Sequence, residues 1–275
     1  MKKRRMLAVL LLVIALGVLG IVLLVDAGLR LTPRVPAPVV TAPPTTVPTP
    51  EPTPAPTLEP TPDTRLCVAI DPGHQQQGNP EQEPIGPGAA ETKPKVSDGT
   101  RGAASGMAEY ELNLIVALQL RDELTARGYR VGMTRESHDV NISHAERAAL
   151  AAEAGADVLV RIHADYSDWS GRQGVMTICM TGANPYHPEL YRQGRALAEQ
   201  ILYGVTAATG ADANGVWETD SMSGINWAVM PVTILEMGFM SNPEEDLRMA
   251  DPEYQHRIVL GIADGLDAYF ASLAP

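Results

Sequence analysis

From residue 66 onward, short apolar runs alternate with longer segments of helical spacing. The apolar runs are bounded by turn-forming or polar residues, and they predict buried strands over 66–70, 129–134, 157–162, 174–180 and 231–235. Segments rich in good helix formers predict helices over 111–127, 143–154, 188–209 and 252–273. This alternation predicts one α/β domain with three layers, in which a mostly parallel, twisted sheet is flanked by helices.

The first 64 residues follow a different pattern. Basic residues occupy positions 2–5, and residues 6–25 carry no charge. A basic cluster before an apolar stretch is typical of a signal peptide, and about 20 apolar residues also suffice to span a bilayer as a helix. We therefore expect 1–27 to be a signal peptide or an N-terminal membrane anchor, with the remainder exported. Residues 28–64 are rich in Pro and Thr and predict a disordered linker, which leaves 65–275 as the globular domain.

Charge and cysteine content exclude several classes of protein. The chain of 275 residues has a formal net charge of −12, and the part from residue 65 onward carries 15 basic and 29 acidic residues. A nucleic-acid-binding domain needs a basic surface, so we expect no nucleic-acid partner. Cys67 and Cys179 are the two cysteines. They are too few for a disulfide scaffold or a cysteine-based zinc finger, and we expect them to be buried apolar residues and not a bridge.

Acid–base and metal-binding side chains follow three of the predicted strands. His74 comes after the first strand, His163 after the run at 157–162, and Glu236 after the run at 231–235. Glu109 stands just before the first predicted helix and could reach the same edge. In sheets of this kind, ligands bind beyond the carboxyl ends of the strands. Two histidines and one glutamate form a known catalytic zinc set, and a further glutamate could shuttle protons.

Each of these residues also has a plain structural interpretation. A single histidine after a strand is more often a hydrogen-bonded structural residue, and Glu109 could simply occupy a helix N-terminus, where the dipole favours a carboxylate. Their convergence on one edge favours a shared site. The remaining histidines fall in predicted loops or helices, and we expect structural roles for them: His138, His144, His187 and His256.

These segments resemble the zinc-dependent N-acetylmuramoyl-L-alanine amidases of peptidoglycan, specifically the family with a C-terminal catalytic domain. The matching segments appear in the family's order, and the resemblance extends over essentially all of 66–270. They are VAIDPGH at 68–74, EYELNL at 109–114, GYRVGMTR at 128–135, AERAALAAEAGADVLVRIHAD at 145–165 and MPVTILEMGFMSNPEED at 230–246. The resemblance implies that His74, Glu109 and His163 are the metal ligands and that Glu236 is the catalytic carboxylate.

The chain departs from the family at a few positions. Asp165 replaces the usual asparagine, and Tyr110 stands where lysine is common. The loop at 75–108 is long and rich in Gly, Pro and Glu. The stretch after His163 reaches Gly174 without the long inserted helix that blocks the site in some regulated relatives, so we expect no obligatory protein activator.

The resemblance implies hydrolysis of the amide that joins the lactyl group of N-acetylmuramic acid to L-alanine. It implies one zinc ion per chain, peptidoglycan as the substrate and an extracytoplasmic location, either membrane-anchored through 1–27 or secreted to the cell wall. Two alternatives are a zinc peptidase that cuts within the stem peptide and a non-catalytic wall-binding module. The second alternative predicts lost site residues, whereas all four are present.

Overall fold

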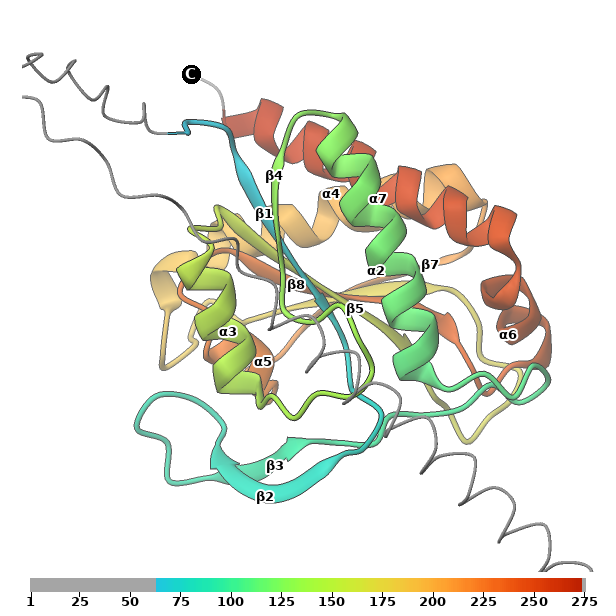
Figure 1. Cartoon of the computed structure of the whole chain (residues 1–275), viewed down its shortest axis with the longest axis horizontal. Helices are drawn as coiled ribbons and strands as arrows, with labels where there is room; N and C mark the ends of the chain where they lie inside the picture. The colour runs from blue at the N-terminus through green and yellow to red at the C-terminus, as the bar shows by residue number, and fades with distance from the viewer. Residues whose placement is uncertain (1–62, 274–275) are drawn as a thin grey trace, which may run out of the picture. The chain divides into compact units, whose positions relative to one another are not determined.

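The computed structural model describes residues 63–273, so the expected signal or anchor at 1–27 and nearly all of the linker lie outside them. A six-stranded sheet forms the centre, in the order β4-β1-β5-β8-β6-β7 (Figure 1). The strands are β1 (Cys67–Pro72), β4 (Arg130–Met133), β5 (Val158–Asp165), β6 (Val175–Cys179), β7 (Ala213–Glu218) and β8 (Val232–Phe239). All neighbouring pairs are parallel except β6 and β8, which confirms the mostly parallel sheet.

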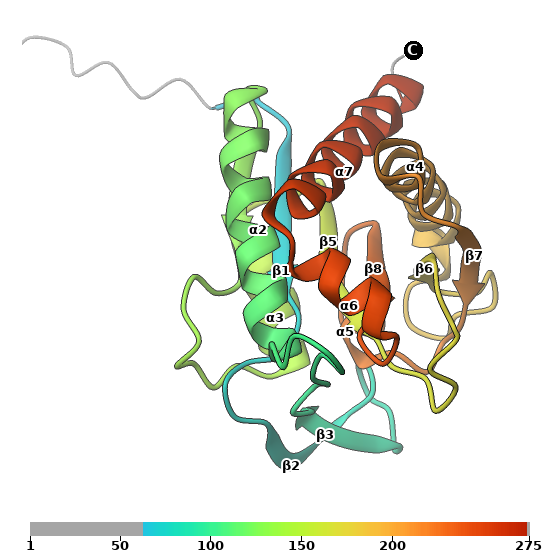
Figure 2. The same ribbon diagram turned by 90° about the vertical axis from the view of Figure 1, so that its right-hand side faces the viewer.

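Helices cover both faces of the sheet. One face carries α2 (Glu109–Ala126), α4 (Tyr191–Thr209) and α7 (Pro252–Leu273), and the opposite face carries α3 (His144–Glu153) and the short α5 (Ser223–Asn226) (Figure 2). A short helix, α6 (Pro243–Ala250), packs against α7 and β8, and a 3₁₀ turn, Pro188–Leu190, precedes α4. Among the described residues, no helix is both long and apolar enough to span a bilayer.

The central strands bury side chains on both faces. Val68 and Ile70 of β1 contribute to the core under α2, α4 and α7, whereas Ala69 contributes to the core under α3 and α5. On β5, Val160 contributes to the core under α2, α4 and α7, and Leu159 contributes to the core under α3 and α5. Strands buried on both sides read as continuous apolar runs, which is why the sequence pattern predicted them. Cys67 and Cys179 are buried free thiols, as expected.

Local sequence signals set the ends of several helices. Ser143 precedes α3, where its hydroxyl accepts a hydrogen bond from the Glu146 backbone N–H and the Glu146 carboxylate accepts one from the Ser143 N–H. This reciprocal pair is a capping box. Helix α4 ends at Gly210, which has a left-handed φ of 74° that favours glycine. Asn242 caps α6 just before Pro243.

Several elements differ from the sequence predictions. The 75–108 loop contains a two-stranded hairpin, β2 (Asn79–Pro84) and β3 (Thr92–Val96), which lies apart from the main sheet (Figure 1). Strand β7 and helices α5 and α6 were not predicted. Strands β5 and β8 continue past their apolar runs, so His163 and Glu236 lie within strands and not after them. The connection at 166–174 contains no helix, as expected.

A buried ion cluster lies at the carboxyl end of β1. The Asp71 carboxylate accepts hydrogen bonds from Arg147 Nη1 of α3 and from Arg161 Nε of β5, each at 2.7 Å, and the Thr134 hydroxyl donates a third. Asp71 and Arg161 are register partners in adjacent strands. Burial alone would raise the pKa of Asp71, but Arg147, Arg161 and Thr134 hold that pKa well below its ordinary value. The Asp71 carboxylate is therefore ionised at neutral pH.

We predict that Asp71→Asn lowers the free energy of unfolding by about 3–5 kcal/mol, because it leaves two buried guanidinium groups without their counter-charge. Urea denaturation at pH 7 measures this change. Glu81→Gln is the control, since Glu81 pairs with Lys95 on the surface and its loss should change stability little. Similar unfolding midpoints for the two variants would contradict a special role for Asp71.

The same contact predicts an acid-sensitive stability. A carboxyl group whose folded-state pKa is depressed stabilises the fold fully above its unfolded pKa of about 3.9, and the stabilisation disappears as the pH falls toward the folded value. The wild-type protein should therefore lose more stability than Asp71→Asn as the pH falls below about 4.

Candidate active site

The turn after β1 brings His74 against β5. The Gly73 N–H donates to the Ile162 carbonyl at 2.9 Å, and a Cβ atom at position 73 would lie 2.2 Å from the His163 ring. Only glycine permits this approach. Two buried arginines hold the turn from below, because Arg135 Nη2 donates to the Gly73 carbonyl at 3.0 Å and Arg147 Nη2 donates to the His74 carbonyl at 2.9 Å.

Glu109 is the first residue of α2, so the helix begins two residues earlier than the predicted start at residue 111. Its side chain is 4% exposed. The Thr100 N–H donates to Oε2 at 2.9 Å, and Asn113 Nδ2 donates to Oε1 at 3.3 Å. A helix N-terminus stabilises a carboxylate, so this position favours an ionised and well-oriented Glu109.

The three expected ligand residues meet at one point. His74 Nε2 lies 3.0 Å from Glu109 Oε1, and His163 Nδ1 lies 3.1 Å from the same oxygen. Ligand atoms of these three residues all lie within 4.8 Å of one another. Two histidines and a glutamate are a donor set suited to zinc, and the structure brings them together as the sequence predicted.

The hydrogen bonds around His74 fit a cation at this point. Its Nδ1 lies 2.9 Å from the Ser97 carbonyl oxygen, which can only accept a proton. A neutral His74 therefore carries its proton on Nδ1 and turns the Nε2 lone pair toward the Glu109 carboxylate. Two electron-rich atoms at 3.0 Å repel each other unless a bound cation or a proton on Nε2 lies between them. A carbonyl that fixes the tautomer of a metal-binding histidine is a common feature of metal sites.

Burial and charge set the protonation states of the three candidate ligand residues, His74, Glu109 and His163. Burial lowers the pKa of His163 to about 4, although the Glu109 carboxylate acts in the opposite direction, so this imidazole is neutral at pH 7. Burial opposes charge on His74 as well, but its contacts with Glu109 raise its pKa above the ordinary value. Burial would raise the pKa of Glu109, yet the two histidines hold it well below its ordinary value.

Glu236 lies next to the cluster and outside it. It is the register partner of His163 across the β5–β8 pair. Its Oε2 is enclosed and has no hydrogen-bond partner among the described residues. Burial raises the pKa of Glu236 well above its ordinary value, the carboxylates of Glu109 and Asp165 raise it further, and Arg161 acts in the opposite direction. A buried carboxyl group with a raised pKa beside a possible metal site is a candidate for acid–base chemistry.

Two cavities open beside these residues. The first cavity has a volume of about 480 Å³, and Asp98, Asp165 and Tyr166 line it together with the cluster and Glu236. The second cavity, of about 260 Å³, lies toward the β2–β3 hairpin and α5. Both reach the same inner residues: His74, Ser97, His163 and Glu236. A substrate at the cluster can therefore extend in two directions.

Sequence reasoning missed the residues that support the site. The Asp71 cluster and Ser97 were not predicted, and Arg161 was the one residue with a readable signal, because a charge inside the apolar run DVLVRI must be paired. His144, for which we expected a structural role, lines the second cavity. Its Nδ1 accepts a hydrogen bond from Arg161 Nη2 at 3.0 Å. The other three histidines line neither cavity: His138, His187 and His256.

Comparisons with known proteins agree on one family. The family model described as N-acetylmuramoyl-L-alanine amidase matches residues 68–268. The chain is 28% identical over 205 residues to the N-acetylmuramoyl-L-alanine amidase LytC of Bacillus subtilis, a match that covers 74% of this chain and 35% of LytC. It is 26% identical over 213 residues to the amidase Rv3717 of Mycobacterium tuberculosis, which covers 75% of this chain and 87% of that protein.

Solved structures give the same result. The crystal structure of the N-acetylmuramyl-L-alanine amidase Ami1 from Mycobacterium smegmatis has a TM-score of 0.68 at 25% identity, covering 75% of this chain and 97% of that one. The CwlD amidase of Clostridioides difficile, solved in complex with the GerS lipoprotein, shares the fold with a TM-score of 0.60. Because the family model matches well over half of the chain, the chain belongs to the N-acetylmuramoyl-L-alanine amidase family.

Proposed function

We propose that this chain is a zinc-dependent amidase that hydrolyses the bond between N-acetylmuramic acid and L-alanine in peptidoglycan. The observation that carries the proposal is the meeting of His74, Glu109 and His163 beside the enclosed carboxyl group of Glu236. This arrangement occurs in a chain that belongs to the N-acetylmuramoyl-L-alanine amidase family. A non-catalytic wall-binding module has no need of a buried carboxyl group with a raised pKa next to a possible metal site.

In this proposal, His74 Nε2, His163 Nδ1 and Glu109 are the metal ligands. When bound there, zinc would polarise the scissile carbonyl and lower the pKa of water toward about 7. The chain supplies orientation for this chemistry. Ser97 fixes the tautomer of His74, and Thr100 holds Glu109 through its backbone N–H. The arginines below the turn keep the His74 ring in place through main-chain contacts.

Glu236 has the properties of the proton shuttle. Its Oε2 is enclosed and unpaired among the described residues, so it is available to accept a hydrogen bond from the attacking water. In the first step Glu236 takes the proton from the water as the carbon–oxygen bond forms. In the second step it returns the proton to the alanine nitrogen as the amide bond breaks. General acid–base groups of this kind contribute about 10²–10⁴-fold in rate.

We further infer that the protein acts outside the cytoplasm. Peptidoglycan is found there, and a basic cluster before an uncharged stretch at 6–25 supports export. If 1–27 stays in the membrane, the Pro/Thr-rich linker separates the domain from it. An extended linker of 37 residues at about 3.1 Å per residue reaches on the order of 100 Å.

The site also supports activity without a protein activator. The connection at 166–174 is short and contains no helix that could lie over the cluster. A related amidase, CwlD, was solved in complex with a lipoprotein partner. For this chain, we propose that the isolated domain is active.

Digestion of peptidoglycan tests the bond and the activator requirement together. Residues 65–275 alone, with zinc and no other protein, should release intact stem peptides that begin with L-alanine and glycan strands with free lactyl carboxylates. Mass spectrometry of the products identifies both. Peptides shortened at an internal bond would indicate a zinc peptidase, and activity only after a cell extract is added would contradict the absence of an activator.

The two glutamates should respond differently to substitution. Glu236→Gln keeps the shape of the side chain but cannot accept the proton, so turnover should fall by about 10²–10⁴-fold while zinc content stays near one ion per chain. Glu109→Ala, His74→Ala and His163→Ala should lower zinc content and turnover together. Metal analysis and kinetics on the same preparations make the comparison. Retained zinc in Glu109→Ala with lost zinc in Glu236→Gln would show that the two roles are reversed.

A further inference from the structure

The second cavity continues from the cluster toward the β2–β3 hairpin. Its wall includes His163 and Glu236 at the inner end, Lys93 and Pro94 from β3, and Ser223 from α5. A ligand that places its amide at Glu236 can therefore extend directly between β3 and α5. The cavity volume of about 260 Å³ suits a short peptide segment better than a glycan strand.

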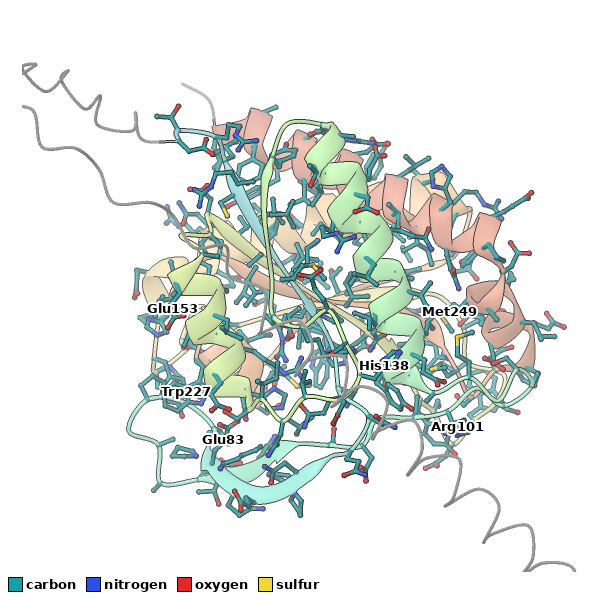
Figure 3. The ribbon with its side chains drawn as sticks, viewed as in Figure 1. Glu83, Arg101, His138, Glu153, Trp227 and Met249 are labelled. Carbon is teal, nitrogen blue, oxygen red and sulfur yellow. The ribbon has the colours of Figure 1, made fainter. Side chains whose placement is uncertain are left out.

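Contacts with the body of the domain fix the hairpin in this position. The Glu83 carboxylate of β2 accepts a hydrogen bond from the His144 N–H at 3.0 Å, and Trp227 Nε1 donates to the Pro84 carbonyl at 2.9 Å. Figure 3 shows the two labelled side chains, Glu83 and Trp227, at the junction between the hairpin and the start of α3. The position of Lys93 is thus set by contacts on the opposite strand.

Lys93 brings an ammonium group to this wall. Its Nζ donates one hydrogen bond, to the Ser221 carbonyl at 2.7 Å, and it forms no ion pair within residues 63–273. An ammonium group has three protons to donate, so two remain. Glu83, its cross-strand neighbour, is directed to the His144 backbone. By contrast Lys95, two residues along the same strand, pairs with Glu81 at 2.8 Å.

Ser223 supplies a second donor in the same cavity. The residue is 5% exposed, and its Oγ has no hydrogen-bond partner among the described residues. A buried hydroxyl without a partner costs stability, so such a group is normally satisfied by ordered water or by a ligand. An ammonium group with two protons left to donate and a hydroxyl without a partner in one cavity together match a carboxylate, which accepts from both.

The first cavity has the opposite electrostatic character. Asp98 and Asp165 line it, and Tyr166, which is 57% exposed, adds an aromatic surface. Carboxylates repel an acidic peptide and accept hydrogen bonds from sugar hydroxyls. The two cavities thus differ in the way that the two sides of a muramoyl–peptide amide differ, with a neutral sugar on one side and an acidic peptide on the other.

We propose that the second cavity is the peptide subsite, in which Lys93 Nζ and Ser223 Oγ donate to a free carboxylate of the stem peptide. The inference rests on the proposed amidase function. It makes Lys93 a specificity-determining residue, because a stem peptide whose carboxyl groups are amidated would lose the charge-assisted contact.

The test compares two muropeptides on the full chain: one disaccharide peptide with free peptide carboxylates, and the same molecule with those carboxyl groups converted to primary amides. The wild-type protein should hydrolyse the free acid with a kcat/KM about tenfold or more above that of the amide, mainly through KM. In Lys93→Met this ratio should fall close to one. Lys95→Met is the matched control from the same strand, and its ratio should equal that of the wild type.

Ser223→Ala provides an independent arm. It should reduce the preference for the free acid while leaving the thermal midpoint unchanged or higher, because the hydroxyl has no partner to lose in the free protein. An unchanged ratio in Lys93→Met, or an equal loss in Lys95→Met, overturns the subsite while the amidase function stands. Failure of the wild type to cut either muropeptide at the muramoyl–alanine bond overturns the amidase function and this inference with it.

Discussion

The contact between Asp71 and its two arginines is the interaction on which the geometry of the site depends. Asp71 ends β1 beside Arg161 of β5, and Arg147 reaches it from α3. Arg147 then continues to the His74 carbonyl. A single buried carboxylate therefore joins two strands, a helix and the turn that presents a candidate metal ligand. Burying three charges is costly, and their mutual hydrogen bonds offset that cost only in this one arrangement.

That constraint explains why the turn can hold an unfavourable conformation. His74 has a φ of 59°, a left-handed value that few residues other than glycine adopt. Arg135 and Arg147 bind the carbonyls on either side of it, and Asn113 adds a contact to Gly73. These contacts together hold His74 in its strained conformation. Functional sites commonly retain unusual backbone conformations in this way. This backbone conformation orients the imidazole so that its Nε2 faces Glu109.

The parts of this fold that could be predicted from sequence are those whose burial leaves a local pattern. Strands β1, β5 and β8 are buried on both faces and read as apolar runs, and their shared edge predicts that His74, His163 and Glu236 lie together. The ends of β5 and β8 were placed too early because these polar residues interrupt the runs, although the ladder continues through the pairing of His163 with Glu236. Backbone pairing is not visible in side-chain hydrophobicity.

The elements that escaped prediction depend on contacts between distant residues. The β2–β3 hairpin contains Pro80, Pro84 and Pro94, which argue against a strand, and the two strands pair only with each other. Its position comes from Glu83 and Trp227, whose partners lie 61 and 143 residues away. The burial of Arg147 could not be predicted for the same reason, since its carboxylate partner lies 76 residues away.

These long-range contacts also decide how charge is distributed around the cluster. A domain with a net charge of −14 would be expected to repel an acidic peptide at every surface. The hairpin changes this locally, because it brings the ammonium group of Lys93 to the second cavity, whose other cation, Arg161, is paired with Asp71. The acidic residues Asp98 and Asp165 remain on the opposite side of the cluster. The β2–β3 hairpin and α5, which the sequence pattern did not predict, therefore contribute to the electrostatic difference across the site. A substrate that is neutral at one end and anionic at the other then has a single favourable orientation.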